Sequence, residues 1–215
     1  PWFFKMLESR GQILVSYNTP EILKVMNLIR KIKSEREMLQ GDNDAYQLYQ
    51  LVKATNKTYG DIAEVGCFNG ATAKLIRKAN KNKELHLFDT FEGLPKLHCK
   101  DDPKQFCEGL YSSSLKDVKN YLKKYKKIHF YKGIFPNTSI PIIDKTFSFV
   151  HLDVDLYEST LESIKFFYPR MNKGGIILSH DYPAIGVRKA FEEFFKCYPE
   201  PVIDLSGSQC LIVKN

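Results

Sequence analysis

From Asp61 onward, short apolar segments alternate with amphipathic helical segments, and this alternation constrains the fold more than any other feature of the chain. We predict strands at 62–66, 85–89, 128–131, 147–153 and 174–179, and helices at 71–80, 116–126, 159–168 and 186–197. Strands that alternate with helices are typical of a mostly parallel sheet with helices on both faces. The chain is therefore expected to have an α/β fold.

Two further strands are predicted at 202–205 and 210–213. The turn between them, Ser206-Gly207-Ser208, is too short for a crossover between parallel strands. These two strands should therefore form an antiparallel hairpin at one edge of the sheet.

The segment before this alternation is predicted to be helical. Thr19 and Pro20 mark a helix start, because threonine is a favourable N-cap and proline fits the first helical position. A polar stretch beginning at Gly41 ends this helix, and Asp44 is expected to cap a second helix at 45–55.

We interpret residues 1–45 as a helical N-terminal extension and residues 46–215 as one α/β domain. The polar stretch 96–114 contains no predicted strand, and long loops of this kind often close over a binding site. Both the extension and this loop are expected to act as lids.

Composition narrows the class of protein. Hydrophobic residues are 43% and charged residues 27% of 215, which excludes a disordered tail, and the longest apolar runs are too short to span a membrane. Five cysteines without a CxxC pair favour a reduced, cytoplasmic setting over a disulfide framework or a zinc clamp. The first residues lack a signal-peptide pattern and an initiator Met, so residue 1 is expected to be a trimmed or fragmentary start.

The net charge of +7 comes largely from lysines at 24–36 and 116–132. Both segments are predicted helices, and no aromatic or glycine pattern typical of nucleic-acid binding accompanies them. We therefore expect solvated lysine faces rather than a nucleic-acid partner.

The first strand ends in a glycine-containing turn, Glu64-Val-Gly-Cys-Phe-Asn-Gly70. Glycine lets the backbone turn sharply and lets a ligand approach closely. The turn is neither G-x-G-x-x-G nor a P-loop, so a site for a phosphate chain is disfavoured. An acid at the end of the second strand, Asp89, is placed to accept hydrogen bonds from ribose hydroxyls. Together they indicate an adenosine ligand without phosphates, which S-adenosylmethionine fits.

Acidic residues follow the fourth and fifth strands: Asp153 and Asp155 after one, and His180-Asp181 after the other. Burying charged side chains at the end of buried strands costs free energy, so their presence indicates that this edge of the sheet is a functional site. Because these strands should be neighbours, Asp153, His180 and Asp181 are predicted to meet around a divalent cation, Mg²⁺ or Mn²⁺. The alternative is that His180 and Asp181 are ordinary loop residues or a helix cap.

Four segments of the chain resemble the macrocin O-methyltransferase (TylF) family: 61–70, 87–95, 151–160 and 174–182. The resemblance extends from about Thr19 to the end, and its most specific part is the string Asp153-Val-Asp-Leu-Tyr-Glu-Ser-Thr160. It implies a seven-stranded, Rossmann-like class I methyltransferase fold that uses S-adenosylmethionine and Mg²⁺ to methylate a hydroxyl. The acceptor implied is a small molecule that contains a sugar.

The resemblance also implies residue roles. Asp153, His180 and Asp181 would hold the metal, and Asp155 would be the general base, although either Asp153 or Asp155 could serve. The family often carries two aspartates after the fifth strand, and His180 replaces the first of them here. The expected cofactor contacts are Glu64, Gly66, Cys67, Phe68, Asn69, Gly70, Asp89, Thr90, Gly133 and Asp153.

Other functions remain open from the sequence. The acceptor could be a catechol-type or other small hydroxylated molecule, because the same metal site would serve. A cofactor-binding module without catalysis would be expected to lack one of Asp153, Asp155 and Asp181, and all three are present. A nucleic-acid methyltransferase is suggested only by the net charge. A homo-oligomer is possible on sequence grounds.

Overall fold

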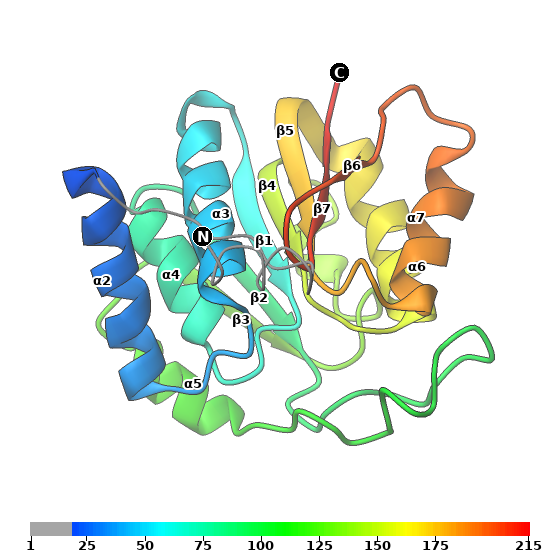
Figure 1. Cartoon of the computed structure of the whole chain (residues 1–215), viewed down its shortest axis with the longest axis horizontal. Helices are drawn as coiled ribbons and strands as arrows, with labels where there is room; N and C mark the ends of the chain where they lie inside the picture. The colour runs from blue at the N-terminus through cyan, green and yellow to red at the C-terminus, as the bar shows by residue number, and fades with distance from the viewer. Residues whose placement is uncertain (1–18) are drawn as a thin grey trace, which may run out of the picture.

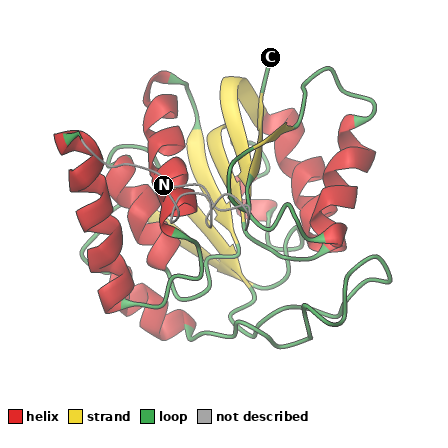
Figure 2. Cartoon of the chain, viewed as in Figure 1, coloured by secondary structure: helices red, strands yellow, loops and turns green. Residues whose placement is uncertain are grey.

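The computed structural model describes residues 19–215, so the part of the predicted extension at 1–18 lies outside the described residues. Its centre is a seven-stranded sheet with the order β3-β2-β1-β4-β5-β7-β6 (Figures 1 and 2). The strands are β1 (Asp61–Val65), β2 (Leu85–Asp89), β3 (Ile128–Lys132), β4 (Phe147–Leu152), β5 (Met171–Ser179), β6 (Ile203–Asp204) and β7 (Cys210–Val213).

The first five strands are parallel, and β7 is antiparallel to both β5 and β6. The predicted α/β fold and its antiparallel edge are therefore confirmed. The central strands β1 and β4 are buried almost throughout, as expected for parallel strands that are covered on both faces.

Six α-helices surround the sheet in the described part of the chain: α2 (Pro20–Glu35), α3 (Asp42–Ala54), α4 (Ala71–Ala79), α5 (Leu115–Leu122), α6 (Tyr157–Phe167) and α7 (Ile185–Phe195). Short 3-10 helices lie at Thr55–Lys57, Ile140–Ile142 and Tyr168–Arg170. Among residues 19–215, none of the helices is both long enough and apolar enough to cross a bilayer.

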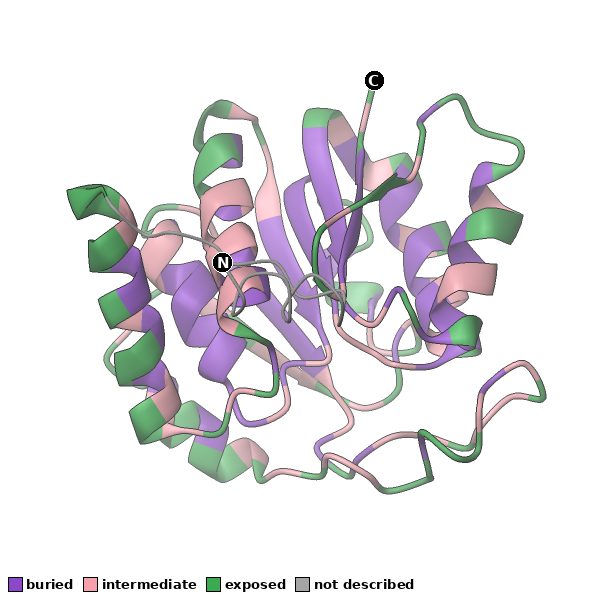
Figure 3. Ribbon diagram, in the orientation of Figure 1, coloured by how far each residue is buried: buried purple, intermediate pink, exposed green. Residues whose placement is uncertain are grey.

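The sheet separates two apolar cores (Figure 3). Helices α2 to α5 pack on one face, where Ile29 and Leu48 belong to the same buried cluster as Ile62 of β1. Helices α6 and α7 pack on the other face, where Phe167 and Phe191 join Val150. Residues 20–54 thus share a continuous core with the sheet.

The start of α2 matches its prediction, because the Thr19 side chain accepts a hydrogen bond from the Ile22 N–H. The start of α3 does not. Gly41 is its N-cap and the helix begins at Asp42, so the prediction that Asp44 caps a helix at 45–55 is wrong. Asp44 lies inside the first turn, and its carboxylate accepts a hydrogen bond from Ser208 instead of from its own helix.

Strand β5 is longer than predicted. It begins at Met171 instead of residue 174, because Met171 pairs with Phe147 and the Gly174 N–H donates to the Lys214 carbonyl. Backbone hydrogen bonds on both sides of β5 therefore extend this strand to residues before Gly174 and Gly175, which mark the predicted start of the strand. Helix α5 is shorter than predicted and ends at Leu122.

The stretch 96–114 contains no helix or strand, as predicted, and its side chains anchor it. Asp101 is buried, and its carboxylate accepts hydrogen bonds from the Tyr157 N–H at 2.7 Å and the His98 N–H at 2.9 Å. The N-cap residue of α6, Leu156, has no side chain that could cap the helix. Asp101 therefore caps α6 from a distant segment and fixes this loop beside the fourth strand.

Replacing Asp101 by alanine is expected to lower the free energy of unfolding by about 0.5–2 kcal/mol, since a helix cap is lost. Urea unfolding followed by circular dichroism measures this loss. The matched control is Asp102→Ala, because the side chain of Asp102 accepts a hydrogen bond from the nearby Lys104 N–H and none from α6. An equal loss in both variants would contradict the capping role.

Candidate active site

A cavity of about 300 Å³ lies at the carboxyl ends of the parallel strands, where α/β proteins bind their ligands. Residues that end or follow all five of these strands line it, together with the loop between α2 and α3. These are Gly66, Cys67, Phe68 and Asn69; Asp89 and Thr90; Gly133; Asp153 and Asp155; His180 and Asp181; and Glu37, Met38, Leu39 and Gln40. Of the site residues predicted from the sequence, Glu64 and Gly70 lie outside this lining.

The turn after β1 lies directly against the end of β4. Gly66 has φ +85°, and a Cβ atom at this position would overlap the carbonyl oxygen of Asp153. The Asp153 N–H in turn donates to the Val65 carbonyl at 2.9 Å. Gly70 has φ +84° and is the N-cap of α4. Glycine is therefore required at Gly66 both for its backbone conformation and for the close approach of the two strand ends.

Asp89 holds the turn from the neighbouring strand. Its two carboxylate oxygens accept hydrogen bonds from the Phe68 N–H at 2.7 Å and the Phe91 N–H at 2.6 Å. Burial raises the pKa of Asp89 to about 6, against the lowering effect of these two hydrogen bonds. Each carboxylate oxygen can accept a further hydrogen bond, so Asp89 can bind ligand hydroxyls while it orders the turn.

Glu64 is fully buried, and its Oε1 lies 2.9 Å from His151 Nδ1. Burial raises the pKa of Glu64, and His151 only partly offsets this effect. The other ring nitrogen of His151 lies 3.2 Å from Gln40 Nε2, which also donates to Asp153 Oδ2 at 3.0 Å. His151 is thus a buried histidine with a partner on each nitrogen. The role of Glu64 as a cofactor contact stays a prediction.

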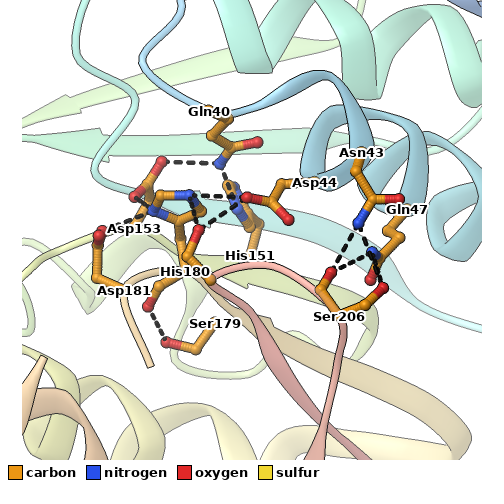
Figure 4. A network of polar contacts seen from close by, with 11 residues as sticks. Gln40, Asn43, Asp44, Gln47, His151, Asp153, Ser179, His180, Asp181 and Ser206 are labelled. Carbon is orange, nitrogen blue, oxygen red and sulfur yellow. Dashed lines mark hydrogen bonds and ion pairs between the residues drawn. The ribbon is translucent and has the colours of Figure 1, made fainter. Parts of the chain in front are cut away.

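The acidic residues after β4 and β5 meet as predicted, around the ring of His180 (Figure 4). His180 Nδ1 lies 2.6 Å from Asp181 Oδ2 and 3.3 Å from Asp153 Oδ1. On the other side of the ring, Nε2 lies 2.9 Å from Ser208 Oγ and 3.7 Å from Asp44 Oδ2. Carboxylates therefore flank both nitrogens of this one side chain.

Electrostatics within this cluster are strong because the groups are buried. Burial would lower the pKa of His180, but the charge of Asp153 and the hydrogen bonds to its carboxylate neighbours raise it overall. Burial would raise the pKa of Asp153, but His180 lowers it overall. The pKa of Asp155 is raised well above its usual value, first by burial and then by the charges of Asp181 and Asp153. Asp155 also has φ +60°, a conformation that few non-glycine residues adopt.

The donor set of the cluster fits a divalent cation. Asp153, His180 and Asp181 each offer one ligand atom, and these atoms lie within 4.8 Å of one another. Carboxylate oxygens suit Mg²⁺ and Mn²⁺, and a neutral imidazole nitrogen is a common ligand of transition metals. His180 Nδ1 would have to lose its proton to bind an ion, because only the free lone pair can coordinate.

Tyr111 brings the loop 96–114 to this cluster. It lines the cavity and makes an edge-to-face contact with Phe68, with ring centroids 6.0 Å apart. Burial raises the pKa of Tyr111, and the charges of Asp155 and Asp181 raise it further. An aromatic pair thus lines the same cavity as the carboxylates, where a ligand with a ring and hydroxyls could lie.

Three residues of this site were not identified as site residues from the sequence: Gln40, Asp44 and Ser208. Gln40 lies in a polar loop, and no local pattern distinguishes it. The predicted hairpin does not reveal Ser208 either, because continuing the register of the Ser179–Cys210 pair places residue 209 opposite residue 180, and residue 208 opposite residue 181. For Asp44, the sequence pattern indicated only a helix cap and gave no sign of a contact with the site.

Comparison with curated proteins finds O-methyltransferases among the relatives of this chain. The chain is 25% identical over 166 residues to a 4'-O-methyltransferase of Streptomyces olivaceus, and the match covers 69% of this chain and 64% of that protein. The name of that enzyme gives its substrate as a dimethoxy-rhamnosyl tetracenomycin. It is 26% identical over 152 residues to the mycinamicin III 3''-O-methyltransferase of Micromonospora griseorubida, covering 63% of this chain and 60% of that protein. The chain thus spans about six tenths of the length of these relatives.

Solved structures share the fold. The O-methyltransferase NovP superposes with a TM-score of 0.71 at 22% identity, over 81% of both chains. The calicheamicin methyltransferase CalS11 superposes with a TM-score of 0.69 at 16% identity, over 92% of this chain and 94% of that one. The model of the macrocin O-methyltransferase (TylF) family matches residues 38–204, which include the whole cavity lining except Glu37. The chain belongs to the macrocin O-methyltransferase (TylF) family.

Proposed function

We propose that this protein transfers the methyl group of S-adenosylmethionine to a hydroxyl of a sugar or of a glycosylated small molecule, with the help of a divalent cation. The observation that carries the proposal is that one cavity joins the turn after β1 and Asp89 to the cluster of Asp153, His180 and Asp181. A donor bound at the first group and an acceptor bound at the second would be held side by side.

The donor end of the cavity suits an adenosine ligand without phosphates. Asp89 would accept hydrogen bonds from the ribose hydroxyls, and the turn at Gly66 lets the ligand approach the backbone. The carboxylate of Asp153 lines the same wall and would balance the positive charges of the methionine part. Holding donor and acceptor in line can contribute about 7–11 kcal/mol to lowering the barrier.

At the acceptor end, Asp153, His180 and Asp181 would hold Mg²⁺ or Mn²⁺. Such an ion acts as a Lewis acid that lowers the pKa of an alcohol. Asp155 lines the same cavity as these residues and follows the same strand as Asp153. Asp155 would therefore take the proton of the acceptor hydroxyl as the methyl group is transferred, with Asp153 as the other candidate base. Tyr111 and Phe68 would cover the acceptor and exclude water.

The sugar acceptor is supported by the name of one relative, which describes a methyltransferase of a rhamnosyl compound. The cavity lining supports it as well, because Tyr111 and Phe68 offer aromatic faces beside the carboxylates. Sugars are bound in many proteins by aromatic rings together with carboxylates, which accept hydrogen bonds from the hydroxyls.

A methyl-transfer assay tests the proposal. Radiolabelled S-adenosylmethionine is incubated with the protein and, in turn, a nucleotide-linked deoxysugar, a rhamnosylated polyketide and a catechol. We expect label in a sugar-containing acceptor, loss of transfer with EDTA, and recovery with Mg²⁺ or Mn²⁺. Transfer to the catechol alone would refute the sugar acceptor, and undiminished transfer in EDTA would refute the metal.

The raised pKa of Asp89 predicts how cofactor affinity depends on pH. The free protein should lose the Asp89 carboxylate as pH falls through about 6, and with it an acceptor for ribose hydroxyls. Affinity for S-adenosylhomocysteine, measured by calorimetry, is therefore expected to be constant above pH 7 and to fall towards pH 5. The control is Asp89→Asn, which binds more weakly but should show no fall in this range. A fall of the same size in both would assign the pH dependence to other groups.

A further inference from the structure

The two nitrogens of His180 face different surroundings. Nδ1 faces Asp153 and Asp181, which are the other two candidate metal ligands (Figure 4). Nε2 faces away from them, towards Ser208 Oγ at 2.9 Å. Neither Ser208 nor Asp44, which lies behind it, belongs to the predicted donor or metal site. Their contacts with the ring therefore call for a separate explanation.

Ser208 and Asp44 form a chain of hydrogen bonds that ends on the ring. The Ser208 hydroxyl donates its only proton to Asp44 Oδ2 at 2.7 Å, so towards His180 it can only accept. His180 Nε2 must then carry the hydrogen in the 2.9 Å contact with Ser208 Oγ. In a neutral imidazole, a hydrogen on Nε2 leaves the lone pair on Nδ1, on the side of Asp153 and Asp181.

The segments behind His180 are closely packed, and Asp44 among them is buried. Asp44 is only 5% exposed, so its charge is kept in the interior. Gly207, with φ +118°, lies so close that a Cβ atom there would overlap Asp44 Oδ1. The side-chain amides of Asn43 and Gln47 donate to the Ser206 carbonyl at 2.7 and 2.8 Å. Helix α3 and the β6–β7 turn are thus held together on the Asp44 side of the ring (Figure 4).

We propose that Asp44 and Ser208 are positioning residues that hold His180 with its Nδ1 lone pair towards the divalent cation. The proposal rests on the proposed function, since it presumes a cation at Asp153, His180 and Asp181. Histidine ligands of metals usually donate their other N–H to a carboxylate or a similar group, which fixes the tautomer and the ring orientation. An aspartate ligand has equivalent oxygens and needs no choice of tautomer. The support is therefore needed because position 180 is a histidine.

Calorimetric titration of the metal-free protein with MnCl₂ alone tests the proposal. Ser208→Ala and Asp44→Asn are expected to weaken Mn²⁺ binding by about 10- to 100-fold, the usual effect of losing a partner of a ligating histidine. The matched control is Asn43→Ala, which removes a clamp on the same turn but no contact with His180. Its Mn²⁺ affinity should stay within about twofold of the unchanged protein.

A double-mutant cycle separates positioning through His180 from a general loosening of the turn. In the His180→Asp background, Ser208→Ala should no longer change Mn²⁺ affinity by more than about twofold, because no imidazole remains to be oriented. The same loss in both backgrounds, or an equal loss in Asn43→Ala, would overturn the proposal. Thermal unfolding of each variant verifies that it is folded.

The outcomes also separate this inference from the proposed function. If the unchanged protein binds Mn²⁺ and Ser208→Ala binds it equally well, the positioning role is refuted and the metal site stands. If the unchanged protein does not bind Mn²⁺, both the metal site and the positioning role are refuted. Methyl transfer by that protein in EDTA would then show that the transferase function survives without the ion.

Discussion

Replacing Asp153 by alanine is expected to lower kcat/KM for methyl transfer by about 10³-fold or more, or about 4 kcal/mol of transition-state stabilisation. The side chain is a candidate metal ligand, lies 3.3 Å from His180 Nδ1, and accepts a hydrogen bond from Gln40. The variant should also lose its response to Mg²⁺. Steady-state kinetics with and without EDTA measure both effects.

Cofactor affinity should change far less, by under about tenfold, because Asp89 and the turn at Gly66 would keep their contacts with the cofactor and only one balancing charge near its methionine part is lost. Calorimetry with S-adenosylhomocysteine measures this affinity. Asp144→Ala, at an exposed aspartate between β3 and β4, serves as the control and should leave both quantities unchanged. If Asp153→Ala loses cofactor binding and turnover to the same extent, the side chain belongs to the donor site and not to the metal site.

Replacing Gly66 by alanine is expected to cost about 3–5 kcal/mol of unfolding free energy. A left-handed conformation costs a non-glycine residue about 1–2 kcal/mol, and forcing a methyl group into a packed site costs about 1–3 kcal/mol more. The upper part of this sum applies, because the Cβ atom would overlap the backbone oxygen of Asp153, which cannot rotate away. Urea unfolding measures the loss, and cofactor binding should be lost with it.

Gly109→Ala is the matched control for this prediction. Gly109 has φ +80°, close to the φ of +85° at Gly66, but a Cβ atom at Gly109 would meet nothing within 4 Å. Only the conformational cost of about 1–2 kcal/mol should therefore be lost. Equal losses in the two variants would mean that the turn after β1 can move away from β4, contrary to the packing described above.

Local patterns carried most of the fold prediction. The alternation of strands and helices after Asp61, the short turn at 206–208 and the acids that follow β4 and β5 are all visible within a few residues of chain. Because parallel strands end at the same edge of a sheet, these patterns also predicted that Asp89, Asp153 and Asp181 would lie around one cavity. Cofactor and metal roles came from this placement together with the family resemblance.

The errors occurred where pairing or packing overrides a local signal. Two glycines suggested that β5 starts at residue 174, whereas pairing of Met171 with Phe147 extends the strand. Asp44 has the residue type and the position of a helix cap, but Gly41 begins the helix and the carboxylate of Asp44 faces Ser208. In both cases the free energy gained from a tertiary partner exceeds that of the local signal.

The amino-acid sequence by itself determined the order of the elements, the family and the set of acids at the edge of the sheet, since each depends on residues that are close along the chain. Only the tertiary structure decided what surrounds His180. Ser208 is 164 residues from Asp44 and 28 from His180, so their contact depends on how α3 packs against the β6–β7 turn. Such packing results from many weak contacts over the whole core, and no short segment encodes it.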